Sequence, residues 1–192
     1  MFSAFLDTCV LVPSLSRDVL LEVAEQSVYR PLWSSEVLDE LERTVRRLTA
    51  ERGVAPDVVD SYVGRLRAQM NRAFPDALVD GWQPLVEAIS LPDATDRHVV
   101  AAALSGRADV IVTENQKDFP PEELPVSMFS QTADTFLLDS LDLHPSAVLS
   151  AVRAVAMRTG RNGPPRSATE IATLLRDRQC PGFGAALLLA LS

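Results

Sequence analysis

The acidic side chains next to apolar segments are the residues of this sequence most able to do chemistry. Asp7 interrupts the apolar run Phe2–Val12, and an acid in such a run is rare unless it is paired, hydrogen-bonded or bound to a metal. Glu40 lies on one flank of an apolar helical face and Glu42 lies on the other flank. Periodicity alone does not choose between these two glutamates.

A second group of polar residues surrounds the apolar run Asp109–Thr113. Asp93 and Asp96 come before this run, and Asn115 and Asp118 follow it. Each acid also has a purely structural explanation. Asp93 can cap a helix, Asp96 can favour a helix dipole, and Asp118 can form a turn.

If these acids meet in space, they repel one another unless a cation lies between them. Oxygen ligands suit Mg²⁺ or Mn²⁺, and the two histidines, His98 and His144, are too few and too far apart for a zinc site. Such a metal can activate a water and stabilise a phosphoryl transition state. For His98 itself we expect a structural role, and His144 precedes a proline as at a helix entry.

The segments that position these acids alternate between strand-like and helical patterns. The expected strands are Met1–Leu6, Arg30–Trp33, a stretch near Ala77–Val79, Asp109–Thr113 and Val126–Phe129. One helix is expected to begin near Ser16 or Asp18, another to begin at Pro56, and a third to end at Gly106. Further helices are expected over Glu36–Leu48, Thr132–Leu141, Pro145–Met157, Ala168–Cys180 and Gly182–Ser192, with a turn at Gly160–Arg166. This βαβα order predicts an α/β fold, a parallel sheet flanked by helices, with the acids at the carboxyl ends of its strands.

Length and composition limit the classes of protein that this chain can be. Its 192 residues fit one domain over residues 1–141 and a helical C-terminal extension over residues 142–192. The net charge of −8 opposes general coating of nucleic acid, although it permits a local basic groove. Cys9 and Cys180 form no disulfide or zinc pattern, so we expect the cytoplasm. The longest apolar stretch, Ala185–Leu191, is far short of a membrane span.

Four segments together resemble the PIN-domain nucleases, and more narrowly the VapC-type toxin ribonucleases of bacterial toxin–antitoxin pairs. The segments are Phe5-Leu6-Asp7-Thr8, the run SSEVLDELER that contains Glu40, the run DATDRHVVAAA that begins at Asp93, and the run IVTENQKDFP that begins at Ile111. The resemblance covers Met1 to about Leu141. It implies a parallel sheet flanked by helices, with acids gathered over the strand ends around Mg²⁺ or Mn²⁺.

The resemblance also implies roles for single residues. By motif position, the implied catalytic residues are Asp7, Glu40, Asp96, Asn115 and Asp118, with Asp7 and Asp96 as the metal ligands and with Asp93 and Thr113 in support. Asn115 departs from the family pattern, because many members have an acid there. Either Asp118 or Asp93 is expected to compensate for it, or a single tightly held ion is expected to suffice. Cys9 stands where members often have Asn, which is expected to alter a hydrogen bond near the metal.

The implied activity is endonucleolytic cleavage of RNA by a cytoplasmic toxin, usually a homodimer, that a cognate antitoxin silences. The candidates for phosphate contacts are Arg43, Arg46, Arg47 and Arg97, although these arginines can equally form the solvated faces of helices. An alternative is a non-catalytic PIN-fold module that binds a protein partner. Asn115 and the net negative charge of the chain favour that alternative.

Overall fold

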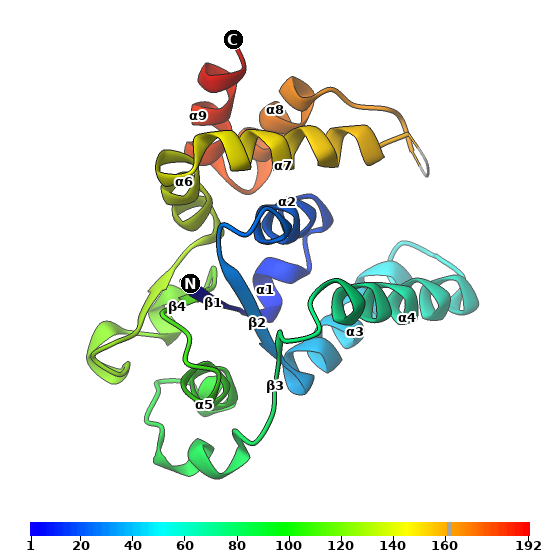
Figure 1. Cartoon of the computed structure of the whole chain (residues 1–192). Helices are drawn as coiled ribbons and strands as arrows, with labels where there is room; N and C mark the ends of the chain where they lie inside the picture. Colours follow the sequence, from blue (N-terminus) through cyan, green and yellow to red (C-terminus); the bar gives the residue numbers. More distant parts are fainter. Residues whose placement is uncertain (161–162) are drawn as a thin grey trace. The chain divides into compact units, whose positions relative to one another are not determined.

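The computed structural model describes residues 1–160 and 163–192, and the chain divides into two compact units. The sheet unit contains Ser3–Val12 and Pro31–Ser130. The helical unit contains Met1–Phe2, Pro13–Arg30 and Gln131–Ser192. Figure 1 colours the chain from one end to the other.

A five-stranded sheet forms the centre of the sheet unit. Its strands, in the order β3-β2-β1-β4-β5, are β1 Ser3–Leu6, β2 Arg30–Ser34, β3 Leu78–Val79, β4 Val110–Val112 and β5 Phe129–Gln131. β1 pairs with β4 in parallel, Ala4 opposite Val110, and β2 pairs with β3 in parallel. Every residue of β1 and β4 is buried, as expected for strands covered on both faces. The predicted parallel sheet is confirmed, but the last strand begins at Phe129, not at Val126, which is exposed.

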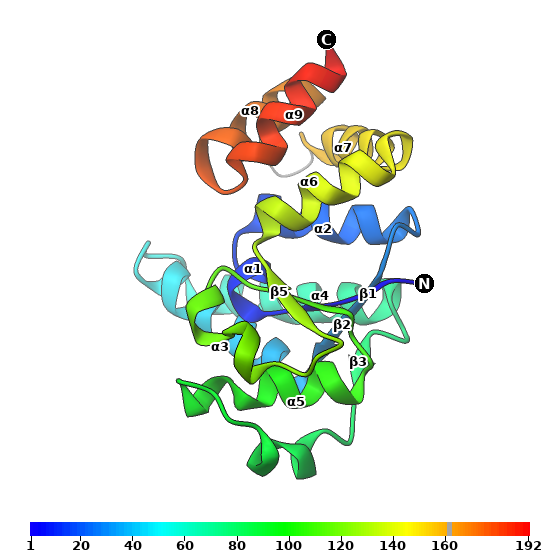
Figure 2. The same cartoon turned by 90° about the vertical axis from the view of Figure 1, so that its left-hand side faces the viewer.

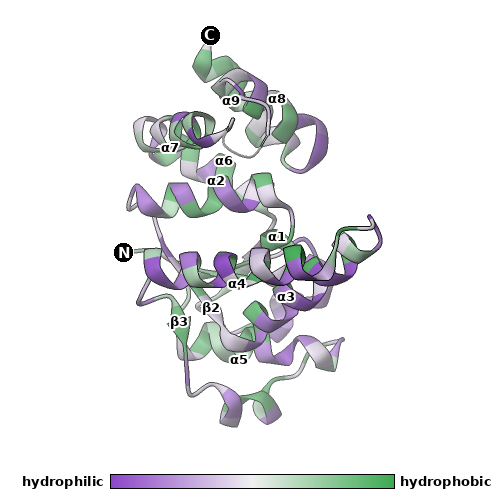
Figure 3. Ribbon diagram, turned by 90° about the vertical axis from the view of Figure 1, so that its right-hand side faces the viewer, coloured by the Kyte–Doolittle hydropathy of each residue, from purple (hydrophilic) through white to green (hydrophobic). Residues whose placement is uncertain are grey.

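Two helices of the sheet unit, α1 Thr8–Leu11 and α3 Ser35–Ala50, begin directly after strands β1 and β2. The others are α4 Pro56–Ala73 and α5 Arg97–Ser105, with short 3₁₀ turns at Gln83–Ala88, Ala94–Asp96, Gln116–Asp118 and Pro121–Glu123. α1 was not predicted, because four residues are too few to reveal a helical period. α3 and α4 lie side by side and are mostly hydrophilic (Figures 1 and 3).

The helical unit joins one N-terminal helix to the C-terminal part of the chain. Its helices are α2 Ser14–Glu25, α6 Ala133–Leu143, α7 Pro145–Arg158, α8 Ala168–Arg178 and α9 Pro181–Leu191. α7 packs on α2, and α8 packs on α9 (Figure 2). Of the predicted turn Gly160–Arg166, residues 161 and 162 lie outside the described residues. The predicted division at residue 141 stays a prediction.

No helix in the described part of the chain is both long enough and apolar enough to cross a membrane. α9 is apolar along its whole length, as its colour in Figure 3 shows, but it has only 11 residues. A membrane-spanning helix needs about 20.

Candidate functional site

Asp7 stands at the carboxyl end of β1, and hydrogen bonds fix both of its carboxylate oxygens. Oδ1 accepts the backbone N–H of Thr8 at 2.6 Å. Oδ2 accepts the hydroxyl of Thr113 at 2.7 Å and the thiol of Cys9 at 3.1 Å. Only 8% of Asp7 is exposed. The acid that interrupts the first apolar run is therefore held in one orientation at the sheet edge.

Glu40 on α3 is held by two residues from other elements. The hydroxyl of Thr8 donates to its Oε2 at 2.7 Å, and Nε2 of His98 lies 3.2 Å from its Oε1. Burial alone would raise the pKa of Glu40, but the bonds from His98 and Thr8 outweigh it and hold the pKa below its ordinary value. Glu42, by contrast, pairs with arginines of α3 and α4. Glu40 and Glu42 therefore differ in their hydrogen-bond partners, a difference that periodicity could not show.

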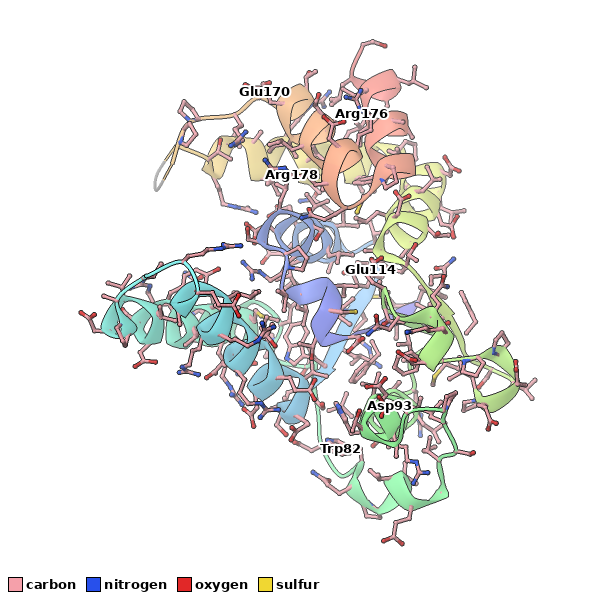
Figure 4. The ribbon with its side chains drawn as sticks, turned by 180° about the vertical axis from the view of Figure 1, so that it is seen from behind. Trp82, Asp93, Glu114, Glu170, Arg176 and Arg178 are labelled. Carbon is pink, nitrogen blue, oxygen red and sulfur yellow. The ribbon has the colours of Figure 1, made fainter. Side chains whose placement is uncertain are left out.

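Asp96 lies immediately before α5 and has other carboxylates around it. Burial and then the negative charges of Asp7, Asp93 and Asp118 raise its pKa to about 6. Acids that are distant in the sequence therefore share one electrostatic environment. Figure 4 labels Asp93 at the amino end of α5. Asp93 is already occupied, because its Oδ1 accepts the N–H and the hydroxyl of Thr95 at 2.8 and 2.7 Å, which lower its pKa.

The turn after β4 contributes a buried hydroxyl and a half-buried acid. Thr113 is fully buried, and its Oγ1 also accepts the backbone N–H of Asn115 at 3.1 Å. The Asn115 residue is exposed, whereas Asp118 is partly buried and its charge acts on Asp96. The negative charge of Asp118 therefore reaches Asp96, whereas the amide of Asn115 carries no charge. Figure 4 labels Glu114, the first residue of this turn that is exposed.

Cys9 takes part in the same hydrogen-bond network. Besides Asp7, its sulfur contacts the Thr113 hydroxyl at 3.3 Å and accepts the backbone N–H of Glu114 at 3.2 Å. Burial and the charge of Asp7 raise the pKa of the Cys9 thiol to about 12. The thiol is therefore protonated at neutral pH, and it acts as a donor rather than as a nucleophile.

The arginines that were proposed for phosphate contacts differ in their present partners. Three lie on α3 and pair with carboxylates: Arg43 with Glu36 at 3.0 Å, Arg46 with Glu42 at 3.0 Å and Asp60 at 2.9 Å, and Arg47 with Glu51 at 3.0 Å. Arg43 also lies 4.0 Å from Glu40. Arg97 differs, since its buried Nε has no hydrogen-bond partner among the described residues. Contact with RNA stays a prediction for all four.

The donor set at this edge suits a hydrated divalent ion. Across residues 1–160 and 163–192, no group of three or more His, Cys, Asp or Glu side chains is arranged to hold a metal. Mg²⁺, however, usually keeps several waters and needs only one or two carboxylates from the protein. Asp7 and Asp96 as that pair stay a prediction; burial first, and then the charges of neighbouring acids, raise the pKa of Asp96.

Sequence reasoning missed the contacts of Thr8 and His98. Thr8 follows Asp7 directly and joins it to Glu40, because its N–H binds the first acid and its hydroxyl binds the second. His98 comes two residues after Asp96. The adjacency of both residues to acids was visible in the sequence, but their shared partner on α3 was not.

Comparison with known proteins gives two family matches and one relative. A model described as PIN domain matches residues 3–117, and a model described as VapC50 C-terminal domain matches residues 133–188. A protein of Mycobacterium tuberculosis (strain ATCC 25618 / H37Rv), named "Putative ribonuclease VapC50", is 42% identical over 77 residues. That match covers 40% of this chain and 45% of the relative, which is under half of either protein. No solved structure matches the chain.

Proposed function

Because this chain belongs to the PIN domain family, we propose that it is an endoribonuclease that depends on Mg²⁺ or Mn²⁺. The observation that carries the proposal is the approach of three acids from separate elements. Thr8 joins Asp7 to Glu40, and the charge of Asp7 acts on Asp96. Asp7 is buried and Asp96 is half-buried, and the repulsion of Asp96 by Asp7 is costly unless it serves a purpose.

In the proposed reaction, RNA is hydrolysed at a phosphodiester. The oxygen of a water adds to the phosphorus, and the bond from phosphorus to one ribose oxygen breaks while that oxygen takes up a proton. A divalent ion supplies, when bound, positive charge that lowers the pKa of the water and neutralises the phosphate. We assign Asp7 and Asp96 to hold the ion. Glu40 and Asp118, with Asn115, orient water around it, and Thr113 and Asp93 support the loops that carry these acids.

The RNA backbone would bind to arginines near these acids. Arg43, Arg46, Arg47 and Arg97 are the candidates. The first three would exchange their present carboxylate partners for phosphate oxygens. Such an exchange is inexpensive, because exposed ion pairs contribute about 0–1 kcal/mol each. Phosphate contacts would make binding of RNA sensitive to salt.

The cellular role that we propose is that of a toxin in a type II toxin–antitoxin pair. The name of the mycobacterial relative and the match to a VapC50 C-terminal domain support this role. We further propose a homodimer in the cytoplasm, inhibited by its cognate antitoxin.

Incubation of total RNA with the purified protein tests the proposed activity. Cleavage should need Mg²⁺ or Mn²⁺, stop with a chelator, and be lost in Asp96→Asn. Mapping of the cut ends would identify the preferred site. The non-catalytic module predicts the opposite: no cleavage, and partner binding that is unaffected by metal or by Asp7→Asn.

A further inference from the structure

The side chain of His98 on α5 contacts both an acid of the candidate site, Glu40, and an aromatic ring, that of Trp82. Its side chain is 11% exposed, and its Nε2 lies 3.2 Å from Oε1 of Glu40. Its ring lies beside Trp82, with the centroids 6.0 Å apart and the planes at 49°. Figure 4 labels Trp82, which directly precedes the 3₁₀ turn Gln83–Ala88 that contacts α5. The imidazole is thus fixed on one side by an aromatic ring, and it meets an acid on the other.

The carboxylate of Glu40 has one short contact at each oxygen, and each contact comes from a different element. Thr8 on α1 binds Oε2, and His98 on α5 faces Oε1. Arg43 is more distant, at 4.0 Å, and its side chain is 61% exposed, so it contributes little. His98 therefore provides the main link between Glu40 and α5.

This link also fixes where Asp96 lies relative to Glu40. Asp96 is two residues before His98, at the point where α5 begins. The negative charges around Asp96 favour moving it away from the other acids. A bond from α5 to Glu40 opposes that movement.

We propose that His98 is a positioning residue, whose Nε2 holds the Glu40 carboxylate and the first turn of α5 at the separation that RNA cleavage needs. The inference rests on the proposed nuclease function. His98 touches neither the ion nor the phosphate in this proposal, and it acts only through Glu40. Residues that orient a metal-site group in this way typically change activity by about 10–100-fold when they are replaced.

Two substitutions of similar size separate this role from simple packing. The amide nitrogen of glutamine reaches the place of Nε2, whereas that of asparagine reaches only the place of Nδ1, and Nδ1 of His98 has no hydrogen-bond partner among the described residues. We expect His98→Gln to keep kcat within about threefold, and His98→Asn to lower kcat by about tenfold or more with little change in KM. Equal kcat values for the two variants would overturn the proposal.

A double-mutant cycle with Glu40→Gln tests whether His98 acts through Glu40. If it does, His98→Asn should cost little further activity once Glu40 is already replaced. Multiplicative losses would overturn the proposal. Thermal melting of each metal-free variant shows whether a loss of kcat only reflects unfolding.

A spectroscopic measurement tests the contact without any reaction. The chain has two histidines, so His144→Gln assigns the imidazole nitrogen signals of His98 directly. In the metal-free protein these signals should shift in Glu40→Gln and stay unchanged in the control Glu42→Gln. Unchanged signals in Glu40→Gln, in a wild type that cleaves RNA, would overturn this inference alone. A wild type that never cleaves RNA, but whose signals respond, would overturn the nuclease function instead.

Discussion

The hydroxyl of Thr113 donates a 2.7 Å hydrogen bond to Oδ2 of Asp7, and both residues are buried. Replacing Thr113 by valine keeps the volume and removes this donor, together with the acceptor of the Asn115 backbone N–H. Loss of a bond to a buried carboxylate costs about 1–3 kcal/mol. Because Cys9 also donates to Oδ2, we expect a cost near the lower end of that range, measured by urea unfolding.

The matched control is Thr173→Val on α8. Thr173 is partly exposed, and its hydroxyl donates to the backbone oxygen of Thr169 in its own helix. This change should alter the free energy of unfolding by less than about 0.5 kcal/mol. Equal losses in the two variants would show that the Thr113–Asp7 bond does not stabilise the sheet edge.

Asp96→Asn should stabilise the metal-free protein while removing activity. The pKa of Asp96 is about 6 in the folded protein, above its ordinary value of 3.8, so the folded state binds this proton more tightly than the unfolded state does. The contribution of Asp96 to the free energy of unfolding is therefore fully present below about pH 4. It falls as the pH rises through about 6 and is lost above that pH. At pH 8 the variant should be more stable than the wild type by about 1 kcal/mol, after allowing for solvent screening.

Urea unfolding between pH 4 and 8 measures this effect. The wild type should lose stability between pH 4 and 6 relative to Asp96→Asn. Asp142→Asn on α6 is the control, because Asp142 is exposed on another helix and its removal leaves the acids around Asp96 in place. Parallel pH profiles for the wild type and Asp96→Asn would contradict the expected repulsion.

The strands, and the place of Asp7 at the end of one of them, were predictable because their signals are local. β1 and β4 are short apolar runs without polar alternation, and the end of each run is marked by a polar residue, Asp7 or Thr113. Parallel strands end at the same edge, so the meeting of these two residues followed from the fold class. α3 was predictable from its apolar period and from the serine that caps it.

The remaining features depend on contacts that the sequence does not display. Periodicity did not separate Glu40 from Glu42, and their partners differ in the structure: a threonine and a histidine for Glu40, and two arginines for Glu42. Asp93 was expected only to support Asp96, and the hydrogen bond that its carboxylate accepts from the Thr95 hydroxyl could not be read from the sequence. The packing of α7 on α2 is likewise a long-range contact, and it includes an ion pair between Arg158 and the buried Glu22.

Binding of Mn²⁺ should raise the melting temperature of the wild type. A ligand that binds only the folded state at about 100 times its Kd adds about 2.7 kcal/mol of stability. Asp7→Asn and Asp96→Asn each remove one of the two proposed ligands, so the shift should largely disappear in both. Asp142→Asn on α6 changes the same charge at an exposed position and should keep the full shift. An equal shift in all four proteins would place the ion elsewhere.

Gly184 on α9 lies against the backbone of α8 and should not accept a larger side chain. A Cβ at this position would lie 2.6 Å from Cα of Arg176 and 2.7 Å from the backbone oxygen of Ala172, so the two helices would have to separate. Gly184→Ala should therefore destabilise the protein by about 1–3 kcal/mol, as overpacking does.

Gly64, in the middle of α4, is the control, because a Cβ added to it would have no other atom within 4 Å. Gly64→Ala should then stabilise by about 1 kcal/mol through helix propensity. Urea unfolding measures both, and effects of the same sign would contradict the close packing of α8 against α9.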